Sequence, residues 1–150
     1  MKLTEEDKNL FEVNNYVKQP YVLAFTTSAD LIFNPVAKEF DNRFSIKSLV
    51  KEHYEGLVGS YNGGIITPIE NVQIGNFKTT VYPLIVKRFN FHQSPSEVLK
   101  TAMELLRDDM LQHSHKRLAL PPLDEWDDYK EIIKSVFQNT QITIKICNKH

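Results

Sequence analysis

Three polar stretches of this sequence could contribute to a ligand site, because each directly follows a short apolar run. They are Asn34-Pro35, residues 90–94 and residues 121–126. In an open parallel sheet, ligands bind in the crevice beyond the carboxyl ends of the strands. If the apolar runs are parallel strands, the three stretches converge at that edge although they lie far apart in the sequence. The strand-end rule therefore predicts where a small-molecule site lies.

Asn34, Asn90 and His92 are the candidates for polar ligand contacts in the first two stretches. The Asn34 amide can donate and accept hydrogen bonds at a ribose or a base edge, and a turn residue before the proline is the structural alternative. His92 can act as an acid–base group near neutral pH, or it can be a solvent-exposed loop residue. Ser94 needs no catalytic role, because Ser94-Pro-Ser-Glu97 has the pattern of a capping box that starts a helix.

Four carboxylates surround Trp126 in and after the third stretch: Asp124, Glu125, Asp127 and Asp128. They can cap the next helix and interact favourably with its dipole, or they can bind a hard cation such as Mg²⁺ or Ca²⁺. Without a cation they would repel a phosphate. Asp124 and His92 are the candidates for catalysis. Trp126 can stack on a base or a partner, or it can be a half-buried anchor.

Gly63 and Gly64 end a turn-rich stretch, residues 59–64, whose composition suits a backbone loop that approaches a ligand. The stretch lacks the spacing and the lysine of a P-loop and precedes a strand rather than a helix, so a tight turn is the alternative. His113 and His115 have a spacing that metal ligands can have, but no third ligand is apparent. We expect neither a metal site nor a cofactor.

Alternating strand and helix patterns predict the elements that position these residues. β-Branched and aromatic runs predict strands, and apolar residues at helical spacing predict helices. The predicted strands are residues 21–27, 31–33, 65–67, 81–89, 117–120 and 141–146, and the predicted helices are residues 45–57, 94–110 and 129–137. Strand–helix–strand connections give parallel neighbours, so we expect residues 81–146 to contain three adjacent parallel strands. The polar residues 1–20 predict a short helix that packs as a lid.

The composition is that of one globular α/β domain. The 150 residues are 41% hydrophobic and 25% charged, which excludes global disorder. Eighteen basic and nineteen acidic side chains give a net charge of −1 without a basic block, so we expect no nucleic-acid partner. The single cysteine, Cys147, excludes an internal disulfide. The start has no signal-peptide pattern and no apolar run could span a bilayer, so we expect a cytoplasmic protein without a membrane partner.

The order of elements and three short motifs resemble a macro domain, a fold known for binding ADP-ribose and related metabolites. Residues 29–35, Ala-Asp-Leu-Ile-Phe-Asn-Pro, are similar to the family's strand that ends in an asparagine-containing loop. Residues 63–67 resemble its strand with glycine, apolar residues and threonine, and residues 118–121 resemble the strand that ends in proline before the distal phosphate loop. The resemblance implies a three-layer α/β/α fold with a mixed, mainly parallel sheet. Residues 1–150 would form a single macro-like domain, with residues 1–20 as an N-terminal extension or lid.

The chain departs from the family pattern at both phosphate loops. The family usually has a Gly-rich loop after the asparagine, whereas residues 38–45 contain no glycine. A second Gly-rich loop is replaced by residues 122–126, Pro-Leu-Asp-Glu-Trp. Asp30 is the nearest candidate for the family's adenine-binding aspartate. These departures predict a divergent macro-like domain in which ligand binding is altered or lost.

Three functions fit the sequence. The first is a domain that binds ADP-ribose or a related nucleotide metabolite, with or without hydrolysing it, in which Asn34 orients the distal ribose. The second is a non-enzymatic protein-interaction module that keeps the fold, and the third is a metal-assisted phosphoesterase that uses His92 and Asp124. The candidate ligand-binding residues are Asn34, Gly63, Gly64, Asn90, His92, Asp124 and Trp126.

Overall fold

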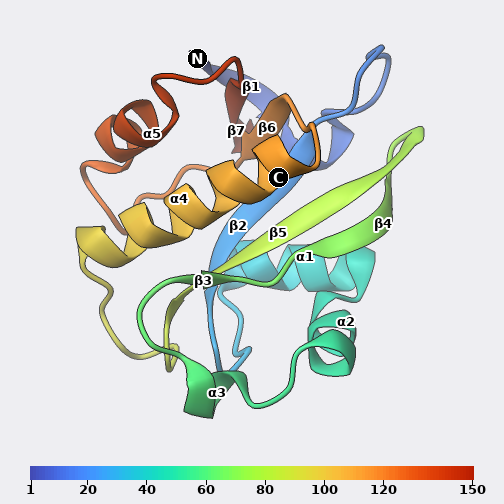
Figure 1. The fold of residues 1–150 in the computed structure, drawn as a ribbon. Helices are drawn as coiled ribbons and strands as arrows, with labels where there is room; N and C mark the ends of the chain where they lie inside the picture. Colours follow the sequence, from blue (N-terminus) through green and yellow to red (C-terminus); the bar gives the residue numbers. More distant parts are fainter.

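A mixed seven-stranded sheet forms the centre of the computed structural model, which describes residues 1–150 (Figure 1). The order of the strands is β1-β7-β6-β2-β5-β3, and β4 also pairs with β5. Strands β1, β7, β6, β2 and β5 are parallel to one another, whereas β3 and β4 run antiparallel to β5. The strands are β1 (Lys2–Asn9), β2 (Val22–Ser28), β3 (Ile65–Ile66), β4 (Ile69–Ile74), β5 (Phe77–Lys87), β6 (Arg117–Leu120) and β7 (Thr143–Lys149).

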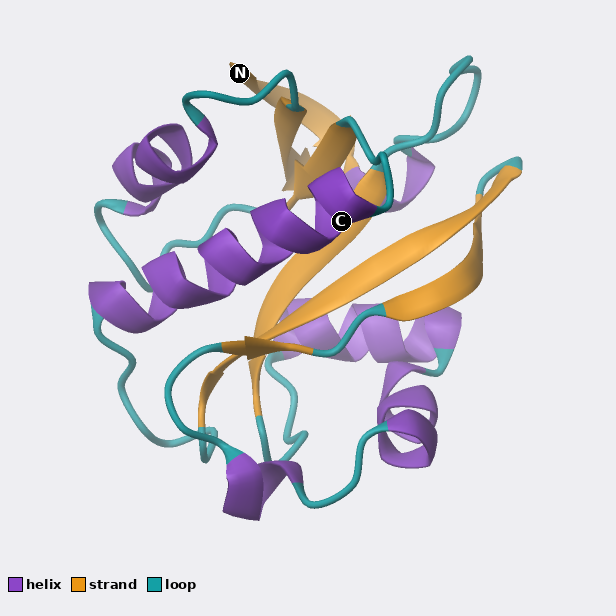
Figure 2. Ribbon diagram, in the orientation of Figure 1, coloured by secondary structure: helices purple, strands orange, loops and turns teal.

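Helices cover both faces of the sheet, which confirms the predicted three-layer α/β/α fold (Figure 2). One face carries α4 (Ser96–Gln112) and α5 (Tyr129–Phe137), and the other carries α1 (Pro35–Phe44), α2 (Ile46–His53) and the 3-10 turn η1 (Leu10–Glu12). The short helix α3 (Leu57–Ser60) lies between α2 and β3 in the chain. No helix is both long enough and apolar enough to cross a membrane.

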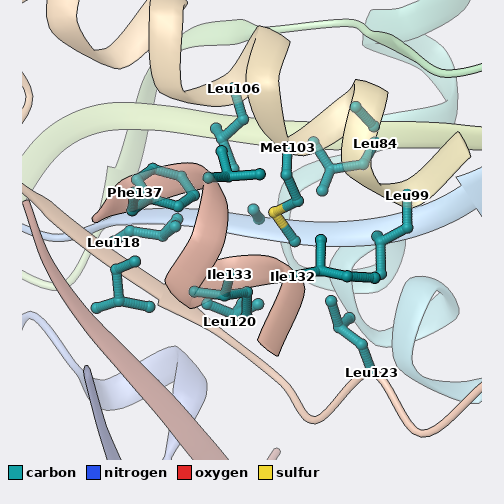
Figure 3. Packing of buried hydrophobic residues seen from close by; sticks show 14 of the residues in the cluster. Leu84, Leu99, Met103, Leu106, Leu118, Leu120, Leu123, Ile132, Ile133 and Phe137 are labelled. Atoms are coloured by element: carbon teal, nitrogen blue, oxygen red, sulfur yellow. The ribbon is translucent and has the colours of Figure 1, made fainter. Parts of the chain in front are cut away.

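The sheet separates two apolar cores, because successive side chains of a strand point to opposite faces. Val22 and Ala24 of β2 belong to the core under α4 and α5, whereas Leu23 and Phe25 belong to the core under α1 and α2. Figure 3 shows the first core, in which side chains of α4 and α5 pack together over β6. The labelled residues are Leu84, Leu99, Met103, Leu106, Leu118, Leu120, Leu123, Ile132, Ile133 and Phe137.

The first residues of the chain form an edge strand, so the short helix predicted within residues 1–20 is confined to the single 3-10 turn η1. β1 pairs in parallel with β7, from Lys2 opposite Thr143 to Asn9 opposite Lys149. Its side chains are mostly polar and partly exposed, so β1 lacks the apolar alternation from which a strand is predicted. Its backbone N–H and C=O groups are satisfied by pairing with β7, and this pairing cannot be read from the side chains of β1.

The strand order also corrects the prediction of three adjacent parallel strands in residues 81–146. β6 and β7 are parallel neighbours, but β2 lies between β5 and β6, with Leu23 opposite Val81 on one side and Ala119 on the other. β2 is almost fully buried, which suits a strand covered on both faces at the centre of a parallel sheet.

Residues 31–53 differ from the prediction as well. Leu31 has a left-handed backbone (φ 56°) and its N–H donates to the Ser28 carbonyl, so residues 28–31 form a turn, and residues 31–33 are an irregular loop and not a strand. The predicted helix over residues 45–57 is shorter, as α2, and α1 precedes it. Ser45 separates the two helices with a second left-handed backbone (φ 54°) and makes no side-chain cap.

Candidate functional site

The loops that follow β2, β5 and β6 meet at one edge of the sheet, because these strands are parallel and lie side by side in the order β6-β2-β5. Backbone pairing continues past the strands, since the Ala29 N–H donates to the Lys87 carbonyl at 2.9 Å. The Lys87 ammonium contacts the Glu125 carboxylate at 2.9 Å, and the Trp126 indole donates to the Ser94 carbonyl at 2.9 Å. The predicted convergence of the three loops is therefore present.

The larger cavity at this edge has a volume of about 330 Å³. Residues after α3 form one wall and residues at the end of β5 form the other; its lining is Tyr61, Asn62, Gly63, Val86, Lys87, Arg88, His92, Gln93, Pro95 and Val98. Lys87 and Arg88 are the charged side chains among them, and no carboxylate lines the cavity. The cavity is therefore suited to an anionic ligand.

Arg88 is held beside the cavity by Tyr61. Its Nη2 group donates to the Tyr61 carbonyl at 2.7 Å, and the guanidinium carbon lies 5.9 Å from the centre of the Tyr61 ring. Burial raises the pKa of the Tyr61 phenol, so the ring keeps its proton and adds no negative charge to the wall. The remaining guanidinium donors are free to point toward a ligand.

A smaller cavity of about 120 Å³ adjoins the first and shares Lys87 with it. Its other lining residues are Thr27, Ser28, Ile32, Phe33, Asn34 and Asn90. Asn34 and Asn90 thus face the same space although they belong to different loops. The Lys87 side chain is 18% exposed and is oriented by its ion pair with Glu125. Sequence reasoning missed Lys87, although a lysine that directly follows the buried run of a central strand could have indicated it.

Asn34 has a structural task in addition to its place in the smaller cavity. It is the N-cap of α1, and its Oδ1 atom accepts a hydrogen bond from the Ala37 N–H at 2.9 Å. The structural alternative for Asn34 is therefore a helix cap, where the sequence suggested a turn residue before Pro35. The Nδ2 group remains available for another partner.

The two glycines of the pair at residues 63 and 64 have different surroundings. Gly63 (φ +83°) lines the larger cavity, and a Cβ atom there would meet nothing within 4 Å. Gly64 (φ +72°) lines neither cavity; a Cβ atom there would lie 2.8 Å from the Val98 carbonyl oxygen of α4. Gly64 is therefore needed for the close approach of the chain to α4, and Gly63 is the one that faces a ligand space.

His92 lines the larger cavity, with its ring edge-on to two phenylalanines. The ring centres lie 5.3 Å from Phe89 and 4.7 Å from Phe91, and the two phenylalanine rings stack at 5.6 Å. Phe91 is 75% exposed. No carboxylate contacts His92, so nothing in the protein orients it as an acid–base pair.

Ser94 does not cap α4, which corrects the capping-box prediction. The helix begins at Ser96, and no side chain caps it. Ser94 Oγ instead donates to the Val86 carbonyl at 2.6 Å, and the Ser94 carbonyl accepts the Trp126 indole N–H. Trp126 is 4% exposed and lines neither cavity. It is the anchor that joins the second and third loops.

The acidic residues after β6 are dispersed and do not surround a cavity. Asp124 is exposed and lines neither cavity, Glu125 pairs with Lys87, and Asp128 accepts a hydrogen bond from the Ser96 hydroxyl at 3.0 Å. Asp128 occupies the N-cap position of α5 without a side-chain cap bond. None of these carboxylates lines the cavity, but Glu125 lies within ion-pair distance of Lys87, which does. No three or more His, Cys, Asp or Glu side chains are grouped so that they could hold a metal ion.

His113 and His115 lie at the other end of α4 and are not part of this edge. The His113 Nδ1 atom is 2.8 Å from the Asp109 carbonyl oxygen, and the His115 ring lies 3.5 Å from the Thr80 hydroxyl. The hydrogen bond to Asp109 and the nearby Asp109 and Glu70 carboxylates raise the pKa of His113. Burial lowers the pKa of His115.

Asp30 lies in the first loop and contacts the second. Its Oδ1 atom accepts hydrogen bonds from the Ser28 hydroxyl and the Ile32 N–H, and its Oδ2 atom accepts one from the Asn90 N–H at 3.1 Å. Burial acts to raise the pKa of Asp30, but the hydrogen bonds from Ser28, Asn90 and Ile32 outweigh it and lower the pKa. Asp30 lines neither cavity, and all three bonds stay within the protein.

Comparisons with known proteins identify the fold. The sequence matches no family model and no curated protein. Among solved structures, the macrodomain of Thermus aquaticus DarG is similar, with a TM-score of 0.74 and 16% identity over 99% of this chain and 98% of that chain. The macrodomain of Mycobacterium tuberculosis DarG has a TM-score of 0.74 and 13% identity over 99% of this chain and 97% of that one. Thermosipho africanus DarTG in complex with ADP-ribose has a TM-score of 0.69 and 13% identity over 97% of this chain, which spans 41% of that protein. The chain therefore has a macro domain-like fold.

Proposed function

We propose that the chain binds ADP-ribose, or a closely related nucleotide metabolite, at the edge where β2, β5 and β6 end. The observation that carries the proposal is the cavity of about 330 Å³ whose charged lining residues, Lys87 and Arg88, are both cationic. A diphosphate carries negative charge that these two groups can neutralise. The fold supports the same ligand class, because one protein of similar structure is a complex with ADP-ribose.

Cationic side chains would take the place of backbone donors in this mode of binding. Where the macro-domain pattern has a Gly-rich loop after Asn34, this chain has helix α1, and where it has a second Gly-rich loop, this chain has Glu125 paired with Lys87. Phosphate loops bind through exposed backbone N–H groups, and α1 satisfies such groups internally. Lys87 and Arg88 supply donors of their own, so loss of the glycines does not remove every phosphate contact.

Polar groups of the smaller cavity would orient the sugar next to the phosphates. Asn34 and Asn90 line the same cavity as Lys87, and amides can both donate to and accept from ribose hydroxyls. Gly63 offers open backbone on the opposite wall of the larger cavity. His92 remains the candidate for proton transfer should the bound ligand be hydrolysed, whereas Asp124 has no place in this proposal.

Calorimetric titration with ADP-ribose tests the proposal, using wild type, Lys87→Ala and Arg88→Ala. Loss of a charge-assisted hydrogen bond costs about 1.5–3 kcal/mol, so each variant should bind roughly 10- to 150-fold more weakly. Lys100→Ala is the matched control, because Lys100 is exposed on α4 and lines neither cavity. Adenosine, which lacks the phosphates, should bind more weakly than ADP-ribose and should not distinguish the variants.

Two results would contradict the proposal. The first is the absence of heat from the wild type at millimolar ADP-ribose. The second is an equal loss of affinity in Lys87→Ala and Lys100→Ala, because this would reflect net charge and not contact at the cavity.

A protein-interaction module is the second candidate function. The exposed side chains of Phe91 and Ile32, at 75% and 55%, favour it, because Phe91 directly follows Asn90 in the chain and Ile32 lines the smaller cavity together with Asn90. Large apolar side chains exposed together are typical of contact surfaces. If ADP-ribose does not bind, this surface is the remaining feature of the edge that a partner could recognise.

A further inference from the structure

Asp30 provides the side-chain hydrogen bond that connects the first loop to the second. Its Oδ2 atom accepts from the Asn90 N–H at 3.1 Å, across 60 positions of the chain, while Oδ1 accepts from Ser28 and from the Ile32 N–H at 3.3 Å within its own loop. The other hydrogen bonds between the loops are backbone bonds of Ala29 to Lys87 and of Asp30 to Arg88, which continue the pairing of β2 with β5. Those bonds end before Asn90, whose turn is closed within its own loop by the His92 N–H donating to the Phe89 carbonyl, so the carboxylate is the group that fastens this turn to the first loop.

The smaller cavity lies between these two loops. Asn34 is on the first loop and Asn90 is on the second, and both line the cavity with Lys87. A shift of one loop against the other would separate the two amides and change the shape of the cavity. Binding sites require their polar groups to be held within roughly 0.5 Å of the productive geometry.

A carboxylate is the side chain that meets all of these hydrogen-bond donors at once. It has two acceptor oxygens, and Asp30 uses one for Ser28 and Ile32 and the other for Asn90. An amide of the same shape has one oxygen and one NH₂ group, so it would present a donor to a donor on one side. Asparagine is therefore not equivalent to aspartate at this position.

We infer that Asp30 is a positioning residue of the binding site, which holds the loop of Asn90 against the loop of Asn34 so that both amides face the ligand. The inference rests on the proposed function. The inference and simple electrostatics predict opposite effects of replacing Asp30, so an experiment can distinguish them. Removing a negative charge near a site for an anionic ligand should strengthen binding, whereas loss of a positioning residue should weaken it.

The first arm of the experiment is calorimetric titration of ADP-ribose into wild type, Asp30→Asn, Asp30→Glu and Asp127→Asn. Asp127 is an exposed residue of the third loop, so its variant removes the same charge without a contact between loops. We expect Asp30→Asn and Asp30→Glu to bind about tenfold more weakly, as for loss of one hydrogen bond to a charged group. Asp127→Asn should bind as wild type or slightly more tightly. Equal or tighter binding by Asp30→Asn would overturn the inference.

The second arm needs no ligand and separates failure of the inference from failure of the proposed function. Amide hydrogen exchange of the free protein should show faster exchange at Asn90 and its neighbours in Asp30→Asn, with β2 and β5 unchanged. If exchange at Asn90 does not change, Asp30 does not hold the loop, whatever the ligand result. If wild type fails to bind ADP-ribose while exchange changes as expected, the proposed function fails and the link between the loops stands. Should Asp30→Asn not fold, Ser28→Ala removes one donor to the carboxylate and should give smaller effects of the same sign.

Discussion

Replacing Gly64 by alanine should destabilise the fold by about 2–5 kcal/mol, and two separate effects contribute to this figure. Gly64 has φ +72°, a conformation that costs a residue with a Cβ atom about 1–2 kcal/mol. The new Cβ atom would also lie 2.8 Å from the Val98 carbonyl oxygen and 3.2 Å from the Ala102 nitrogen, both in the backbone of α4. Helix backbone cannot rotate away as a side chain can, so overlap of this kind costs about 1–3 kcal/mol more.

Gly63→Ala is the matched control, because it has the first effect without the second. Gly63 has φ +83°, but a Cβ atom there meets nothing within 4 Å. We expect Gly63→Ala to cost about 1–2 kcal/mol. For a chain of this size each kcal/mol lowers the melting temperature by roughly 2–4 °C.

Urea denaturation followed by circular dichroism and by Trp126 fluorescence measures both variants. Trp126 is the only tryptophan and is 4% exposed, so its emission reports loss of the folded state. If Gly64→Ala and Gly63→Ala have the same unfolding free energy, the close contact between residue 64 and α4 is not a constraint, and the reasoning is refuted.

Two further predictions concern the anchor of the loops and the far end of α4. Trp126→Phe keeps an aromatic ring but loses the indole hydrogen bond to the Ser94 carbonyl, so it should lower the unfolding free energy by about 1–2 kcal/mol in urea denaturation; an unchanged midpoint would show that this bond contributes nothing. The effect of His113→Gln on the free energy of unfolding should depend on pH. The hydrogen bond to the Asp109 carbonyl and the Asp109 and Glu70 carboxylates raise the pKa of His113 in the folded protein above its ordinary value of 6.5. Stabilisation from a raised pKa is complete below the unfolded pKa and is lost as the pH rises through the folded pKa. Wild type and variant should therefore differ most below the ordinary histidine pKa of 6.5 and converge as the pH rises through the raised pKa of the folded protein, and a difference that does not vary with pH would contradict this assignment.

Much of the sheet could be predicted from the sequence because its central strands are strongly apolar. β2, β5 and β6 are almost fully buried, so their β-branched and aromatic runs were apparent without any tertiary information. β1 was missed for the opposite reason. It is an edge strand with mostly polar side chains, and only its pairing with β7 makes it a strand.

Strand order and helix boundaries could not be predicted, because they depend on long-range pairing and on single backbone conformations. Nothing in residues 21–28 indicates that β2 inserts between β5 and β6. Ser45 and Leu31 have left-handed backbones without being glycine; Ser45 ends α1 and Leu31 closes the turn after β2, at positions that side-chain patterns do not mark.

The place of the candidate site followed from strand ends, but its chemistry did not follow from residue type. Asn34 and His92 do line cavities at the predicted edge. Lys87 and Arg88 could not be recognised as cavity residues from the sequence, because charged residues at the ends of strands are common on any protein surface. Trp126 and Gly64 were candidates for ligand contact, but both are packing residues. The Trp126 indole is bonded to the Ser94 carbonyl and Gly64 lies against α4, and neither orientation can be read from residue type.

The pairing of β1 with β7 has a consequence for synthesis of the protein. β1 precedes the other six strands of the sheet in the chain, yet its partner β7 follows all of them. β2 faces a similar delay, because its neighbours β5 and β6 are both made much later. A nascent chain that stops before β7 therefore exposes the unpaired edges of β1 and β6, and unpaired strand edges promote association with other chains. Truncation before β7 should therefore lower the yield of folded protein, because it leaves these edges without their partner.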